Sequence, residues 1–236
     1  MMERERMEHP MPYAERWTAA GPIRMVTPED RVDELGVSAA ATVADGAPLG
    51  LAAFAAATFT LGAVIAGWTP LAGLVGALPV LIIFGGIAQF IAAMWSFRKG
   101  ETFWATFLGV FGSWYAVLSL GILLGGAAAG VGGALGGLGG PLAQSVGLGV
   151  SVAMFAFIAA YLTWAATGIS SVMVGVCGLL TASLALIAVA FFIGPLSSPL
   201  VLMAAGYCGI VSALIAFYAS AAIVINSALH REMLPY

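Results

Sequence analysis

The sequence predicts an all-α integral membrane protein with six transmembrane helices. First, 61% of the residues are hydrophobic and only 8% are charged, whereas about a quarter are charged in an ordinary soluble domain. Second, residues 102–230 contain no Asp, Glu, Lys or Arg, as expected where a charge would be buried in hydrocarbon. Third, apolar segments recur at about the 20-residue length that crosses a bilayer.

The predicted spans are residues 48–66, 70–97, 102–125, 144–165, 169–194 and 199–226. A polar residue precedes a proline at three of the starts, which predicts a capped first helical turn at Asp45, Thr69 and Ser198. Pro79 lies inside the second span and should kink it. Residues 125–140 are rich in Gly and Ala and carry no charge, and we expect them to form the one long loop of the membrane part.

The basic residues predict the orientation. With both termini in the cytoplasm, six spans place all eight basic residues on one side and the uncharged residues 125–140 on the other, which favours a multi-pass inner (plasma) membrane protein. The eight are Arg4, Arg6, Arg16, Arg24, Arg31, Arg98, Lys99 and Arg231.

Two regions follow from this pattern. Residues 1–44 are polar, mixed in charge and proline-bearing, so we expect a disordered cytoplasmic tail. Residues 45–236 form the six-helix transmembrane domain. No basic run is interleaved with aromatic residues, so the sequence gives no support for nucleic-acid binding.

Polar side chains within the predicted spans are the candidates for function, because each needs a partner at membrane depth. The amide of Gln89 suits either an interhelical hydrogen bond or contact with a carboxylate. Ser113 places a hydroxyl beside the aromatic ring of Trp114. Other hydroxyls are expected to bond to carbonyls of their own helices, and these belong to Thr58, Thr60, Thr181 and Ser183.

The sequence offers no parts for an enzyme within the membrane. His9 and His230 lie outside the predicted spans, and no acidic or basic residue lies deep within one. We therefore expect no catalytic group, no metal site and no cofactor. A path of aromatic rings, hydroxyls, amides and helix N-termini would suit a small, weakly acidic solute.

Five short motifs stand out along the chain, namely DGAPLGL at residues 45–51, FGGIAQ at 84–89, KGETF at 99–103, FGSW at 111–114 and AGYCG at 205–209. Together they resemble the acetate/succinate permease family of bacteria and fungi. Residues 45–51, DGAPLGL, are similar to the family signature Asn-Pro-Ala-Pro-Leu-Gly-Leu. Residues 84–89, FGGIAQ, match the family's second span. Residues 99–103, KGETF, resemble its Lys-Gly-Asn-Thr-Phe turn, and residues 111–114, FGSW, its Tyr-Gly-Ser-Phe segment. Residues 205–209, AGYCG, are also similar, so the resemblance covers roughly residues 45–236.

This resemblance implies a homohexamer of transporter protomers, each with its own path for acetate and related short carboxylates such as succinate, moved with a proton. The family's aromatic and aliphatic constriction would correspond here to Phe54, Phe111 and Leu180. Further residues along the route would be Pro48, Leu49, Gly50, Leu51 and Gln89, with Ser113, Trp114 and Asp45 as additional substrate-binding candidates.

Four residues depart from the family pattern, and two of them, Glu101 in place of an asparagine and Ser96 in place of a carboxylate, lie near the start of the third span and the end of the second. Asp45 stands where the family has Asn, and it could cap the first helix, bind or relay a proton, or weaken the affinity for anions. Phe111 replaces a tyrosine and so removes a hydroxyl from the constriction.

Two other functions fit the same sequence. A passive channel for acetic acid, ammonia or similar solutes needs the same charge-free path but cannot concentrate its substrate. A membrane sensor or scaffold would instead use the tail at residues 1–44 to bind a partner.

Overall fold

The computed structural model describes residues 44–70, 73–135, 141–194 and 198–236. The expected tail at residues 1–44 therefore lies, apart from its last residue, outside the described residues. Within the described part, six helical segments are long and apolar enough to cross a membrane, which confirms the six predicted spans. The protein is thus an all-helical, multi-pass membrane protein.

The second span consists of three consecutive helical pieces. The helices, in chain order, are α3 (Ala47–Ile65), α4 (Gly73–Val80), η1 (Leu81–Ala88), α5 (Gln89–Lys99), α6 (Thr102–Leu135), α7 (Pro141–Ala166), α8 (Ser171–Ile193) and α9 (Pro199–Leu229). Together α4, η1 and α5 make one span, Gly73–Lys99.

Pro79 marks the place where the second span changes its helix type. It lies within α4, and the π-helix η1 begins two residues later. Proline cannot donate the backbone hydrogen bond of an α-helix interior, and the wider π turn re-pairs the following groups at a shifted spacing. The interruption expected at Pro79 is therefore a change in hydrogen-bond register.

The expected loop at residues 125–140 is wrong over most of its length. Helix α6 continues to Leu135 and α7 begins at Pro141, while residues 136–140 lie outside the described part. The stretch has no proline or hydrogen-bonding side chain to compete with the helix, and an apolar environment forces backbone groups to pair internally. Gly and Ala alone do not end a helix under these conditions.

The expected helix caps are only partly correct. The side chain of Asp45 accepts a hydrogen bond from the Ala47 backbone N–H at 2.9 Å, although Gly46 occupies the N-cap position of α3. Ser198 occupies the N-cap position of α9, but its hydroxyl donates backwards to the Gly194 carbonyl at 3.1 Å. The Thr69 hydroxyl donates to the Pro70 carbonyl at 3.4 Å, and residues 71 and 72, whose N–H groups it was expected to cap, lie outside the described part.

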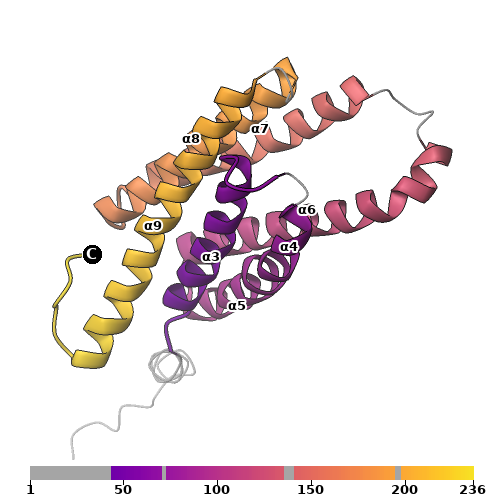
Figure 1. The fold of residues 1–236 in the computed structure, drawn as a ribbon. Helices are drawn as coiled ribbons and strands as arrows, with labels where there is room; N and C mark the ends of the chain where they lie inside the picture. The colour runs from indigo at the N-terminus through magenta and orange to yellow at the C-terminus, as the bar shows by residue number, and fades with distance from the viewer. Residues whose placement is uncertain (1–43, 71–72, 136–140, 195–197) are drawn as a thin grey trace, which may run out of the picture. The chain divides into compact units, whose positions relative to one another are not determined.

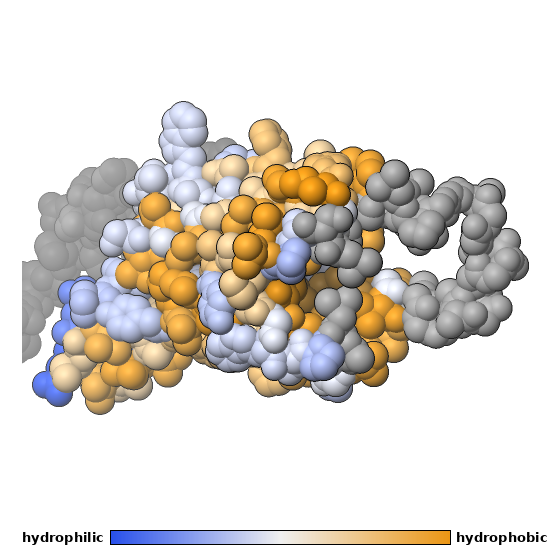
Figure 2. All heavy atoms as spheres, turned by 45° about the horizontal axis from the view of Figure 1, so that its top comes forward, coloured by the Kyte–Doolittle hydropathy of each residue, from blue (hydrophilic) through white to orange (hydrophobic). Residues whose placement is uncertain are grey.

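Helix α3 lies between two groups of helices (Figure 1). On one side it packs most extensively against α9, which continues to α8 and α7. On the other side it contacts η1, α5 and α6. Figure 2 shows one face of the molecule, where hydrophobic side chains cover much of the described surface and the most strongly hydrophilic atoms lie at one end. The surface therefore suits contact with lipid.

The contact between α3 and α9 depends on two glycines that face each other. A methyl group placed on Gly206 would lie 2.4 Å from the backbone nitrogen of Ala66 and 2.7 Å from the carbonyl oxygen of Gly62. Hydroxyls add hydrogen bonds between helices, because Ser220 donates to the Pro48 carbonyl at 2.7 Å and Ser212 to the Val176 carbonyl at 2.8 Å. Small residues and hydroxyls are the usual means of holding helices together in lipid.

We predict that Gly206→Ala destabilises the domain. The new methyl group would meet backbone atoms that cannot rotate away, so the free energy of unfolding should fall by about 1–3 kcal/mol. Thermal unfolding of the purified protein in detergent would measure this. Gly76→Ala is the matched control, because a methyl group there meets nothing within 4 Å. Equal unfolding temperatures for the two variants would contradict the close approach.

Candidate functional site

A cavity of about 370 Å³ lies within the helix bundle. Helices α3, α4, α6, α7, α8 and α9 all contribute to its wall. Most of the wall is apolar, and the side chains that carry hydrogen-bonding groups are Thr58, Trp114, Tyr115 and Ser183. Among the described wall residues none is charged.

Three phenylalanine rings pack together beside the cavity, and one of them, Phe111, lines its wall. The Phe54 ring lies 5.1 Å from the Phe107 ring and 6.1 Å from the Phe111 ring, measured between centroids, and Phe107 and Phe111 are 5.3 Å apart. All three are fully buried or nearly so. Phe111 reaches the cavity wall and Phe54 does not. We call this set the phenylalanine cluster.

The structure brings together some of the candidate residues. Phe111, Leu180 and Trp114 line the cavity, and Phe54 packs against Phe111. Phe107 completes the cluster, and sequence reasoning missed it. The signal was available in its spacing, because Phe103, Phe107 and Phe111 recur every four residues along α6 and so share one face.

A hydroxyl pair lies one helical turn beyond the phenylalanine cluster. The Thr58 and Tyr115 oxygens are 2.6 Å apart, and the Thr58 hydroxyl also donates to the Phe54 carbonyl at 2.7 Å. Both side chains are buried, Tyr115 with only 2% of its surface exposed. Thr58 thus bonds to its own helix, as expected, and in addition to α6. Its contact with Tyr115 was not predicted from the sequence.

Ser183 supplies a third hydroxyl to the cavity wall. It donates at 2.8 Å to the Ala205 carbonyl of α9, so the expected bond to its own helix is wrong. The cause is the close packing of α8 on α9, which brings a carbonyl of the neighbouring helix within reach. Thr60 and Thr181 do bond to carbonyls of their own helices, at 2.8 Å each.

Gln89 is completely buried, and neither its amide oxygen nor its amide nitrogen has a hydrogen-bond partner among the described residues. The level of Gln89 along the bundle follows from a contact of the next residue, Phe90. Helix α6 comes close there, because a methyl group placed on Gly112 would lie 3.2 Å from the Phe90 backbone nitrogen. Gln89 therefore lies at about the level of Phe111. Leaving a buried amide unpaired costs about 1–3 kcal/mol, so this residue calls for an explanation beyond packing.

The start of α3 lies beside a small group of charges. The Lys99 ammonium contacts Glu101 at 2.7 Å and Asp45 at 3.4 Å. A basic residue between two carboxylates offsets the charge that Asp45 brings to this end. Of the neighbouring candidates, Gly50 and Leu51 are buried, Pro48 is half-buried and Leu49 is exposed. None of the four reaches the cavity wall.

The C-terminal segment folds back on the end of α9. Asn226 accepts hydrogen bonds from the backbone N–H groups of Met233 and Leu234 at 2.8 and 3.0 Å and donates to the Leu234 carbonyl at 2.8 Å. The Tyr218 hydroxyl donates to the Pro235 carbonyl at 2.6 Å. Burial, together with the negative charges of Asp45 and Glu101, raises the pKa of Tyr236 to about 12. The phenol at the chain end is therefore neutral and faces the charged group.

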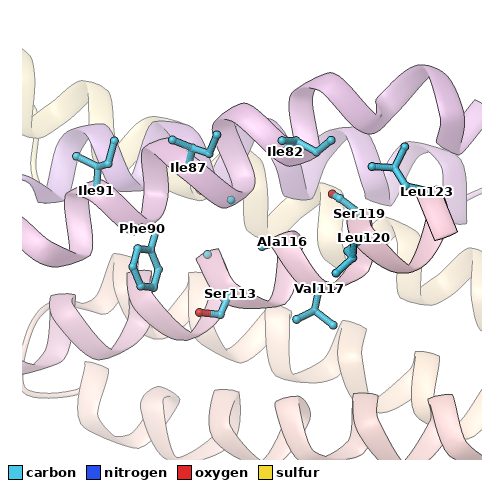
Figure 3. Close-up of a pocket in the computed structure, with 12 residues that line it drawn as sticks. Ile82, Ile87, Phe90, Ile91, Ser113, Ala116, Val117, Ser119, Leu120 and Leu123 are labelled. Carbon is cyan, nitrogen blue, oxygen red and sulfur yellow. The ribbon is translucent and has the colours of Figure 1, made fainter.

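Ser113 is not brought together with the other candidates. Its hydroxyl donates to the Gly109 carbonyl of its own helix at 2.8 Å. It faces a separate groove of about 690 Å³ on the outside of the bundle, between η1, α5 and α6. Figure 3 shows Ile82, Ile87, Phe90 and Ile91 on one side of this groove and Ser113 with the α6 residues on the other. In the single chain, this groove opens outward and away from the cavity.

The described residues contain no group of three or more His, Cys, Asp or Glu side chains that could hold a metal ion. The cavity itself offers hydroxyls, one indole and aromatic rings. Such a wall can bind, orient and pass a small solute, but it holds no residue able to act as a general base at neutral pH.

Six spans enclosing an uncharged cavity define a membrane protein of the transport class. A sequence model of the GPR1/FUN34/yaaH family matches residues 34–232, and the chain belongs to this family. The sequence resemblance is therefore confirmed.

Two similar proteins have described roles. Acetate permease A of Emericella nidulans is 34% identical over 83 residues, which are 35% of this chain and 28% of the permease. The match thus spans less than a third of the permease. The solved structure of the bacterial acetate channel SatP is similar with a TM-score of 0.71 and 28% identity, over 82% of this chain and 99% of that one. The fold of the described domain is therefore that of a known membrane channel.

We predict that Asn226→Ala releases the C-terminal segment. Without the Asn226 acceptor, the N–H groups of Met233 and Leu234 should exchange with deuterium about ten times faster or more, because one side chain holds both. Hydrogen–deuterium exchange measured by mass spectrometry on the detergent-purified protein would report this. The exposed neighbour Ser227→Ala is the control, and equal exchange in both variants would contradict the role of Asn226.

Proposed function

We propose that this protein moves acetate and related short-chain carboxylates across the inner (plasma) membrane, and that it is a transporter and not an enzyme. The observation that carries the proposal is the cavity between the helices, whose described wall is uncharged, bears hydroxyls and includes Phe111 of the phenylalanine cluster. The proposal is supported by family membership and by the likeness to an acetate permease and an acetate channel.

The size of the cavity fits a small solute with some water. A water molecule takes up about 30 Å³ of liquid volume, so a space of about 370 Å³ holds an acetate-sized molecule and a few waters. A methyl group would lie against Leu180 and the aromatic rings, and the carboxyl end would lie toward the hydroxyls. Larger dicarboxylates such as succinate would fill more of the same space.

We propose a route that begins at the charged group beside α3. The solute would pass the first helical turn of α3 at Pro48–Leu51. It would then pass Gln89 and the phenylalanine cluster and enter the cavity. Gln89 has both a donor and an acceptor unpaired, which complements the two oxygens of a carboxyl group. Opening the cluster requires movement of the Phe54, Phe107 and Phe111 rings, which makes it a natural gate.

Beyond the charged group at its start, the proposed route passes no charged side chain among the described residues, and this supports proton coupling. A bare carboxylate is strongly disfavoured in a dry apolar passage, so we propose that each carboxylate moves together with a proton. The alternative is a passive channel, in which the solute only equilibrates. A charge-free wall also suits a passive channel, and an imposed proton gradient separates movement together with a proton from movement of the anion alone.

We also propose that protomers assemble as a homohexamer with both termini in the cytoplasm. The groove that holds Ser113 is apolar and opens outward, so it offers a surface that a second copy can cover. In that arrangement Ser113 would lie between protomers, away from the solute path.

We predict that purified protein in liposomes takes up labelled acetate and accumulates it above equilibrium under an inward proton gradient. Coupling a solute to a proton lets the gradient drive accumulation, and a proton ionophore should then abolish it. Uptake that only equilibrates would favour the channel. Protein-free liposomes correct for acetic acid that crosses the lipid, and no protein-dependent uptake would overturn the proposed function.

We predict that Gln89→Leu slows acetate uptake about tenfold but stabilises the fold. Leucine has a similar size and leaves no unpaired amide, so the free energy of unfolding should rise by about 1–3 kcal/mol, while the solute loses one hydrogen-bonding contact. Uptake and thermal unfolding measure the two effects. Ser119→Ala is the matched control, because Ser119 is also buried and unpaired but lines the outer groove. Its uptake should stay normal, and normal uptake by Gln89→Leu would remove Gln89 from the route.

A further inference from the structure

Each of the three cavity hydroxyls lies three or four residues after one residue of the predicted constriction, on the same helix. Thr58 follows Phe54 by four residues on α3, Tyr115 follows Phe111 by four on α6, and Ser183 follows Leu180 by three on α8. These spacings are one helical turn. Because α3, α6 and α8 are the first, third and fifth spans, they cross the membrane in the same direction. The hydroxyls therefore form a second layer on one side of the apolar one, and we call it the hydroxyl layer.

The hydrogen atoms of this layer are already committed to protein acceptors. The Thr58 hydroxyl has one hydrogen, and at 2.7 Å from a carbonyl oxygen that hydrogen must point to Phe54. The distance of 2.6 Å between the Thr58 and Tyr115 oxygens allows either to donate, but with the single Thr58 hydrogen on the Phe54 carbonyl the phenol supplies the hydrogen of this contact. The Ser183 hydrogen points to the Ala205 carbonyl. All three hydroxyls present only oxygen lone pairs to the cavity.

This pattern matches one form of the solute better than the other. The indole N–H of Trp114 is the remaining side-chain donor among the described wall residues, against three hydroxyl acceptors. A protonated carboxylic acid has one O–H donor and one carbonyl acceptor, so it can satisfy both kinds of group. A carboxylate has acceptors only, and it would face the lone pairs of the hydroxyl layer in a space that holds no compensating charge.

We propose that Thr58, Tyr115 and Ser183 form a specificity-determining layer that accepts the O–H of a protonated short-chain acid and rejects its anion. This inference rests on the proposed function and assigns the selected form of the substrate to named hydroxyls. Tyr115 is the sole titratable side chain among the described wall residues, and a phenol is neutral at physiological pH. The pH dependence of uptake therefore comes from the solute.

The first test measures the charge that the wild-type protein moves. Labelled acetate uptake into proteoliposomes is followed while potassium gradients and valinomycin set the membrane potential, and protein-free vesicles provide the background. The protein-dependent rate should be the same at zero and at about 100 mV inside-negative potential. It should fall roughly 100-fold from pH 5.5 to pH 7.5, as the protonated fraction does. A rate that the potential slows severalfold would identify the anion and overturn the proposal.

The second test uses two substitutions with opposite expected effects. Thr58→Val removes the acceptor of the phenol hydrogen, so Tyr115 becomes a donor toward the cavity. Uptake should then become sensitive to the potential and fall less steeply with pH. Tyr115→Phe removes one hydroxyl and frees no donor, so uptake should slow about fivefold and remain insensitive to the potential.

Matched controls separate the layer from general damage. Thr60→Val is a control on the same helix, because it removes a hydroxyl that donates to the Ala56 carbonyl of α3. Tyr161→Phe removes an exposed phenol on α7. Both should behave as wild type. Wild-type potential and pH dependence in Thr58→Val would overturn the proposal while leaving acetate transport intact. If Thr58→Val does not fold, the wild-type potential test and Tyr115→Phe decide, and absence of any wild-type uptake would instead refute the proposed function itself.

Discussion

The structure depends on one constraint, which is that hydrocarbon offers no water to a polar group, so each backbone or side-chain dipole must find a partner inside the protein. This constraint explains why α6 runs on through its glycine-rich end to Leu135. It also explains why Pro79 is followed by a π-helix, whose shifted spacing re-pairs the groups that proline disturbs. The hydroxyls between helices follow the same rule, since Ser212, Ser220 and Ser183 each donate to a carbonyl of a neighbouring helix.

Because buried polar groups normally pair within the protein, a buried group without a partner marks a place where a role beyond packing is expected. Gln89 breaks the rule at the level of the phenylalanine cluster, where a structural role alone would favour an apolar residue. Its cost to stability is offset by close packing elsewhere, above all where Gly62 and Gly206 let α3 and α9 approach. Ser119 breaks the rule as well, but it does so at the outer groove. Ser119 thus lines the outer groove, whereas Gln89 is buried away from both the groove and the cavity.

The layered arrangement that we propose for the interior would combine two requirements of a selective path. A ring of apolar side chains excludes ions and water because none of its atoms can replace a hydration shell. A neighbouring layer of hydroxyls can distinguish solutes by their donors and acceptors, because hydrogens fixed on protein carbonyls cannot turn toward the cavity. Away from this interior, Lys99 pairs with Asp45 and Glu101 beside the start of α3, close to Tyr236. The charged group beside α3 and the uncharged wall of the cavity are thus formed by different residues.

The sequence by itself determined the class of protein, the six spans and the family. Long apolar runs and the absence of charge leave few alternatives, because the bilayer fixes both the length and the composition of a span. The sequence also placed Phe54, Phe111 and Leu180 in one group through the resemblance. Only the tertiary structure decided which side each residue faces, so it moved Ser113 to the outer groove and added Phe107. It alone paired Thr58 with Tyr115 and left Gln89 without a partner, because hydrogen bonds between helices depend on how the helices pack and not on local sequence.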